Sequence, residues 1–339
     1  MIQRQTLMQH VQHIQTRLVS HHAMAWMLVP GSLWFLAGLY LDGWAHNHDK
    51  VDNTFFTPWH AVFYSGYLVV ALTLMIIVAL VQRNGASWHT ALPRPLRTAV
   101  VAAPMFALAG VSDLWWHTTY GFENGIELLL SPPHLMLAGS MFFILGASAR
   151  LDDGTHHGWQ RLPYILSAGA AWSVITFMWQ FNHPYGIVWP ETLRAGSTGI
   201  MTGIAGTVAN SALTAGVALF LMRQRMPYGA LTGILLANAL GIALMGDEYR
   251  FAVGALVAGI GSEGIRWLMR HQPWMQQLRI HAAVVATLTS LCYMLVIMAT
   301  TVILWPIHIW LGTVCLAGVA GWALTVLIPT AASPSAEAN

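Results

Sequence analysis

Two short motifs of aspartate and histidine recur in the amino-acid sequence, and both residue types bind metal ions in proteins. Asp42 and His46 are four positions apart, and so are Asp113 and His117. On a helix, this spacing places both side chains of a pair on the same face. The sequence therefore predicts two helix faces that each offer one carboxylate and one imidazole.

A further histidine follows each pair after a short loop, in a Pro-x-His motif. The first copy is Pro58-x-His60 and the second is Pro132-x-His134. Proline is favourable in the first turn of a helix, where its missing N–H costs nothing, so the histidine two positions later has a defined direction. The motifs recur after 71 to 74 residues. This repetition predicts two copies of one helical hairpin.

Each hairpin is expected to bring one carboxylate and two imidazoles together. Such a set, with coordination positions left open, can bind iron(II), copper or zinc. The predicted metal ligands are Asp42, His46 and His60 at one site, and Asp113, His117 and His134 at the other. Further candidates are His48, Glu127, His183 and His308. Any one of these residues alone is typical of a polar group at a helix end, but the matched repetition favours metal ligands.

The composition indicates what kind of elements position these residues. Of 339 residues, 56% are hydrophobic and only 8% are charged, whereas soluble domains carry about a quarter charged residues. This indicates a helical protein that crosses the membrane several times, and excludes a soluble enzyme, a nucleic-acid-binding protein and a disordered scaffold. Cys292 and Cys315 form no CxxC motif, which argues against a disulfide framework, a thiolate zinc site and c-type haem.

Apolar segments long enough to span a bilayer predict an all-α fold with about ten transmembrane helices. They lie at 24–42, 58–82, 97–116, 131–149, 162–181, 198–222, 227–246, 250–268, 280–304 and 307–329. Residues 1–20 are expected to form an amphipathic segment on the cytoplasmic face. Residues 24–149 form the metal-binding half with its repeated hairpins, 162–329 contain six further helices, and 330–339 are a disordered tail.

The basic residues predict the orientation. With ten spans, twelve Lys and Arg fall on the side of the two termini and three on the opposite side. Because basic residues concentrate in cytoplasmic loops, both termini are expected to be cytoplasmic. The Asp and His motifs then lie near the outer face of an integral membrane protein, which we expect in the inner membrane of a bacterium.

The order of these motifs resembles the C subunit of particulate methane and ammonia monooxygenases, over about residues 40–140. In that subunit, Asp-x3-His, Thr-Pro-x-His, Asn-x3-His and Pro-x-His follow one another and bind copper within the membrane. The resemblance implies copper sites at Asp42, His46 and His60, and at Asp113, His117 and His134. The loops here are longer by one and by three residues, Asp113 stands where the family has Asn, and spans 6–10 have no counterpart in the shorter family subunit.

The favoured function is a copper membrane monooxygenase of a small apolar substrate, with iron or zinc as alternative metals. Electrons would come from a quinol, another donor or a partner subunit. Aromatic residues near the motifs are typical of a belt at the membrane interface, and the alternative is an apolar cavity for the substrate; they are Trp44, Phe55, Phe56, Trp59, Trp115, Trp116, Tyr120, Phe122 and Trp189. The alternatives are a non-catalytic copper or zinc transporter or sensor, and a b-type haem protein that uses His60 and His134.

Overall fold

The computed structural model describes residues 20–50, 56–83, 85–121, 129–152, 154–192 and 196–327. Within these ranges every regular element is a helix, which confirms the predicted all-α class. Residues 1–19 of the predicted amphipathic segment and the predicted tail 330–339 lie outside the described residues.

Each of the ten predicted apolar segments contains a helix. The helices are α2 (His21–Asn47), α3 (Pro58–Arg83), α5 (Arg94–Tyr120), α7 (Pro132–Leu145), α8 (Leu162–Met178), α9 (Gly196–Arg223), α10 (Ala230–Gly246), α11 (Arg250–Leu268), α12 (Trp274–Thr300) and α13 (Ile307–Leu324). Among the described residues, seven helices are long and apolar enough to cross a membrane. Helices α7, α8 and α10 have only 14, 17 and 17 residues, so the predicted count of ten membrane spans is not confirmed.

Side chains from neighbouring helices mark the ends of two of these shorter helices. The hydroxyl of Ser167, on α8, donates to the carbonyl of Leu145 and accepts from the amide of Ala149, where α7 ends. At the start of α10, the Glu263 carboxylate accepts hydrogen bonds from the amides of Gly229 and Leu231 at 2.7 and 3.1 Å. These contacts satisfy backbone groups that a helix end leaves without a partner.

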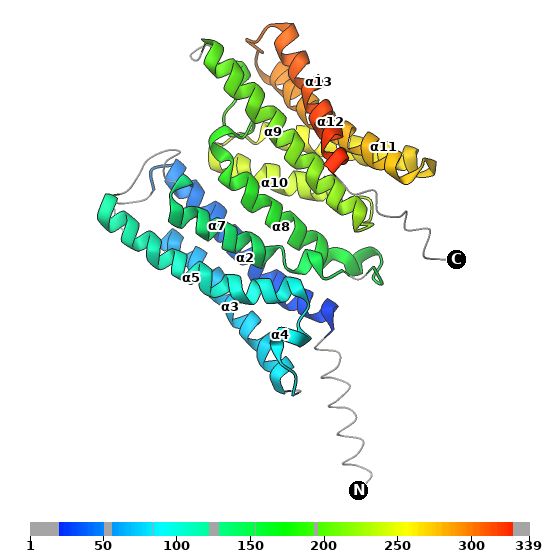
Figure 1. The fold of residues 1–339 in the computed structure, drawn as a ribbon. Coiled ribbons are helices and arrows are strands. Elements are labelled where there is room, and N and C mark those ends of the chain that lie inside the picture. Colours follow the sequence, from blue (N-terminus) through cyan, green and yellow to red (C-terminus); the bar gives the residue numbers. More distant parts are fainter. Residues whose placement is uncertain are drawn as a thin grey trace. The chain divides into compact units, whose positions relative to one another are not determined.

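The chain divides into two compact units, Met1–Met178 and Trp179–Asn339. In the first unit, α2 packs on α3, α5 packs on α7, and α8 packs on both α2 and α7 (Figure 1). Helix α8 belongs to the first unit because it packs on α2 and α7, which carry Asp and His motifs.

Helices α2 and α3 approach each other closely at two glycines. A Cβ atom added to Gly38 would lie 2.6 Å from the Cα of Phe63, and one added to Gly66 would lie 2.5 Å from the Cα of Phe35. Real Cβ atoms do not approach backbone this closely, so both positions require glycine. Gly38 lies one turn before Asp42, and the contact therefore sets the distance between that aspartate and α3.

An aromatic cluster fills the space between α2, α3 and α5. The ring of Phe106 lies 4.9 Å from that of Phe35 and 4.6 Å from that of Tyr67, measured between centroids. Phe35 and Phe106 are completely buried, and the Tyr67 hydroxyl donates to the carbonyl of Ala103 at 2.8 Å. Such clusters bury large apolar areas with specific ring geometry and hold the three helices in register.

In the second unit, α12 packs on α9, α11 and α13, and α10 packs on α11. Arg250, at the start of α11, joins three segments of this unit. Its guanidinium donates to both carboxylate oxygens of Glu191, at 2.8 and 3.0 Å, and to Glu248 at 2.8 Å. The hydroxyls of Thr300 and Thr301, at the end of α12, accept from the same guanidinium.

Replacing Arg250 with alanine is expected to lower the free energy of unfolding by about 1.5–3 kcal/mol, the usual value of a hydrogen bond to a charged group. Burial alone would raise the pKa of Glu191, but hydrogen bonds from Arg250 and Thr301 and the Arg250 charge lower it. A carboxyl with a lowered pKa stabilises the fold above its ordinary pKa, and this stabilisation is lost as the pH falls through the lowered value.

Melting of the full chain in detergent, followed from neutral pH to pH 3, tests this prediction. As the pH falls, protonation of Glu191 should lower the melting temperature of the wild type. This decrease should be smaller in Arg250→Ala. The matched control is Arg270→Ala, which removes an exposed arginine near the other end of the same helix. Equal melting of Arg250→Ala and Arg270→Ala at neutral pH would contradict the stabilising role of this cluster.

Candidate metal centre

The first Asp/His group forms where α2 ends and α3 begins. Asp42 and His46 lie on one face of the last turns of α2, and the helix stops after them because Asp49 adopts a positive φ of 54°. Helix α3 starts at Pro58, where the Thr57 hydroxyl accepts from the His60 amide at 3.1 Å. This N-terminal cap fixes the first turn and directs His60 toward α2.

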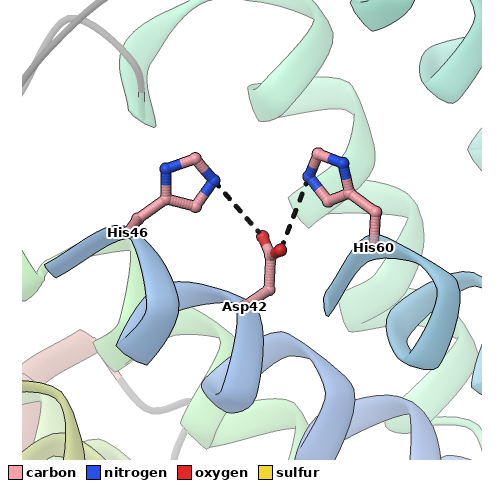
Figure 2. A group of neighbouring side chains, drawn as sticks. All are labelled: Asp42, His46 and His60. Carbon is pink, nitrogen blue, oxygen red and sulfur yellow. Dashed lines mark ion pairs between the residues drawn. The ribbon is translucent and has the colours of Figure 1, made fainter. Parts of the chain in front are cut away.

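The Asp42 carboxylate lies between the two imidazoles (Figure 2). Its Oδ2 is 3.9 Å from Nε2 of His46, and its Oδ1 is 3.5 Å from Nε2 of His60. The three side chains are 17–27% exposed. Among the described residues, the buried Oδ1 of Asp42 has no hydrogen-bond donor. A buried carboxylate oxygen without a donor is unfavourable, and a cation held between the three side chains would satisfy it.

The second group lies at the junction of α5 and α7. Asp113 and His117 lie on one face of α5, which ends at Gly121 with a φ of 85°. Ser131 caps α7, and its hydroxyl also lies 2.8 Å from Nδ1 of His134. Oδ1 of Asp113 is 3.5 Å from Nε2 of His117 and 3.3 Å from Nδ1 of His134. The Asp113 and His117 side chains are only 4% and 5% exposed.

A backbone contact fixes which nitrogen of His117 faces the group. Nδ1 of His117 lies 3.3 Å from the Gly121 carbonyl oxygen, which can only accept a hydrogen bond, so Nδ1 carries the proton. The lone pair of Nε2 then points toward the Asp113 carboxylate. A second proton on Nε2 or a bound cation would have to lie between these two groups. Metal-binding histidines commonly donate their other ring N–H to a carbonyl in this way. The arrangement suits a metal ligand, and an imidazolium–aspartate ion pair is the alternative.

Both groups have the dimensions of a metal site. Within each group the ligand atoms all lie within 4.8 Å of one another. Bonds of about 2.1 Å to a tetrahedral ion separate its ligands by about 3.4 Å, close to the 3.3–3.9 Å found here. Three protein ligands leave at least one coordination position for water or substrate, as in catalytic sites.

The two groups are neighbours within the first unit. His134 is close enough to interact electrostatically with Asp42, His46 and His60, and His46 interacts with His117. The sequence predicted two similar sites but gave no distance between them. The contacts of α2 with α3, of α5 with α7, and of α3 with α5 bring the groups together.

None of the further candidates that lie among the described residues belongs to a three-ligand group. His48 follows the end of α2, its Nδ1 lies 2.8 Å from the Trp44 carbonyl, and its ring stacks on that of Trp44. His183 and His308 belong to the second unit, and neither is part of a three-ligand group among the described residues. His183 is completely buried, which lowers its pKa to about 3 and keeps it neutral. Glu127 lies outside the described residues.

Three of the aromatic residues near the motifs lie on the surface, as the interpretation as an interfacial belt predicts. Phe56 is 83% exposed, Trp115 is 57% exposed and Tyr120 is 62% exposed. Their positions near helix ends suit a membrane interface, where aromatic side chains are common. Phe55 and Phe122 lie outside the described residues.

Tyr64, Gly38 and Gly66 were not among the predicted site residues. Tyr64 lies one turn after His60 on α3 and interacts electrostatically with both Asp42 and Asp113. The spacing of four from His60 was a signal for it, because residues four apart share a helix face. The glycines matter only through the opposing backbone, which the sequence does not show.

The seven long apolar helices among the described residues indicate an integral membrane protein in contact with the lipid bilayer. Two groups of His and Asp side chains in its first unit could hold metal ions. Comparisons with protein-family models, curated proteins and solved structures find no match for this chain.

Proposed function

We propose that the chain is a membrane metalloprotein with two metal ions in its first unit, and that it is a copper-dependent oxidoreductase or a subunit of one. The observation that carries this proposal is the pair of neighbouring groups, each with one carboxylate and two imidazoles within 4.8 Å. Imidazole and carboxylate ligands suit copper, iron and zinc alike, and the resemblance to the copper monooxygenase C subunit favours copper.

A bound copper ion would supply one-electron transfer and the activation of dioxygen. The chain's own residues have defined tasks around it. Asp42 and Asp113 neutralise part of the charge of each ion, and the Gly121 carbonyl holds the Nδ1 proton of His117 so that Nε2 faces the site. Ser131 caps the first turn of α7, which carries His134. The proposed substrate is small and apolar, with electrons from a quinol, another donor or a partner subunit.

Transport or sensing is the second class of function for a membrane metal protein. A transport path needs ligands at several depths, and the described residues offer three-ligand groups only at these two neighbouring positions. A b-type haem with His60 and His134 as axial ligands is also disfavoured. Nε2 of His60, the nitrogen that would bind the haem iron, already lies 3.5 Å from an Asp42 oxygen, which leaves little space for a haem ring at this imidazole.

Oxygen consumption tests the proposed reaction. The full chain is loaded with copper in lipid vesicles, a quinol is added, and the rate is compared with that of the double variant Asp113→Ala, His117→Ala. We expect the variant to lose at least about 100-fold in rate, as is typical when catalytic metal ligation is removed. Equal rates, together with metal-dependent ion flux across sealed vesicles, would replace the proposal with transport.

The proposed orientation places both termini in the cytoplasm and the two groups near the outer face of the inner membrane of a bacterium. It rests on the twelve-to-three distribution of basic residues. A topology reporter fused after Asn339 should be active on the cytoplasmic side, and activity on the opposite side would overturn the orientation.

A further inference from the structure

The side chain of Tyr64 extends from α3 toward α5, between the helices that carry the two groups. Its ring lies 6.2 Å from that of His60, measured between centroids, in an edge-to-face arrangement. A Cβ added to Gly110, on α5, would lie 2.9 Å from the Tyr64 hydroxyl. Gly110 is three residues before Asp113. Tyr64 therefore begins beside one group and ends next to the helix of the other.

The phenol is within electrostatic range of one aspartate from each group, Asp42 and Asp113. The rings of Phe63 and Phe106 also lie near the Tyr64 ring, at 5.3 and 6.0 Å between centroids. In such apolar surroundings electrostatic interactions are stronger than in water. A polar hydroxyl within electrostatic range of both carboxylates in this environment can affect both of them.

We infer that Tyr64 is a positioning residue that couples the two groups, so that metal binding at one changes the affinity of the other. This inference rests on the proposed metal sites. A tyrosine hydroxyl has one proton and can donate it to one carboxylate at a time. A metal ion on Asp42 would occupy that carboxylate and leave the hydroxyl proton to Asp113, and the reverse would hold for an ion on Asp113. Coupling between the sites is reciprocal.

The experiment measures copper affinity by titration of the full chain in detergent. Affinity at the second group is compared between the wild type and the double variant His46→Ala, His60→Ala, in which the first group is removed. The ratio of the two dissociation constants is the coupling, and we expect about fivefold or more, the lower end of measured couplings between sites. The same ratio is then measured with Tyr64→Phe added to the wild type and to the double variant. We expect this ratio to be at least about threefold smaller than the ratio measured without Tyr64→Phe.

Tyr67→Phe is the matched control. It removes a hydroxyl from the same helix three residues later, and that hydroxyl donates to the Ala103 carbonyl. We expect Tyr67→Phe to keep the wild-type coupling. Gly110→Ala is a second variant that keeps the phenol but displaces its hydroxyl, and it should reduce the coupling as Tyr64→Phe does. The electron paramagnetic resonance spectrum of copper at the second group should change with Tyr64→Phe and Gly110→Ala, and not with Tyr67→Phe.

The outcomes separate the inference from the proposed function. A wild-type chain that binds no copper overturns the metal sites themselves. If the chain binds two ions but Tyr64→Phe and Tyr67→Phe show the same coupling and the same spectra, the role of Tyr64 is overturned. The metal sites themselves are then kept. If Tyr64→Phe does not fold, Gly110→Ala decides between the same two results.

Discussion

Replacing His60 with alanine is expected to reduce the metal ions bound per chain from two to one. The variant leaves Asp42 and His46 as the remaining protein ligands of the first group. Replacing a residue that hydrogen-bonds to a metal ligand already lowers metal affinity by about 10- to 100-fold. We therefore expect the loss of a ligand itself to lower metal affinity by at least about 100-fold. His134→Ala should have the same effect on the second group, and each variant should keep the ion of the other group.

Elemental analysis of the purified full chain, after removal of loosely bound metal, checks this prediction. The matched control is His48→Ala, which removes an imidazole two residues after His46. Because His48 contacts the Trp44 carbonyl and ring, this control should keep two ions. Unchanged metal content in both His60→Ala and His134→Ala would mean that these groups are not ligand sets.

Replacing Gly38 with alanine is expected to destabilise the first unit and to weaken metal binding at the first group. The added methyl group would lie 2.6 Å from the Cα of Phe63, so α2 and α3 must move apart. Overpacking of this kind costs about 1–3 kcal/mol or more. Asp42 is one turn further along α2 and His60 is on α3, so separating the helices also separates these two ligands.

Thermal melting and copper titration of Gly38→Ala measure the two effects. The second group is carried by α5 and α7, and we expect it to keep its ion. Gly139→Ala is the matched control, because a Cβ at Gly139, on α7, would meet no atom within 4 Å. Wild-type melting and two tightly bound ions in Gly38→Ala would show that this close approach does not position Asp42.

The sequence predicted the helices and the composition of the two groups because both depend on local patterns. Apolar runs locate helices, and a spacing of four locates pairs on one face. Asp42 and His46 met both conditions, and so did Asp113 and His117. The Pro-x-His motifs were equally local, since Pro58 and Pro132 lie at the starts of α3 and α7.

Other features depend on contacts between distant residues, and no local pattern reveals these. Helix α7 ends at Leu145 although the apolar run continues to residue 149; the Ser167 hydroxyl from α8 binds the carbonyl of Leu145 there. Helix α10 begins at Ala230, where the Glu263 carboxylate from α11 binds its first amides. The proximity of the two groups has the same origin, because it requires α3 to pack on α5.

The most direct test of the account is the metal content of the full chain after copper loading and dialysis. We expect two copper ions per wild-type chain and none in a variant that carries both His60→Ala and His134→Ala. Circular dichroism of the variant should show an unchanged helix content, which separates ligand loss from unfolding. A wild-type chain that retains no copper, iron or zinc, or a folded double variant that retains the same amount as the wild type, would contradict the account.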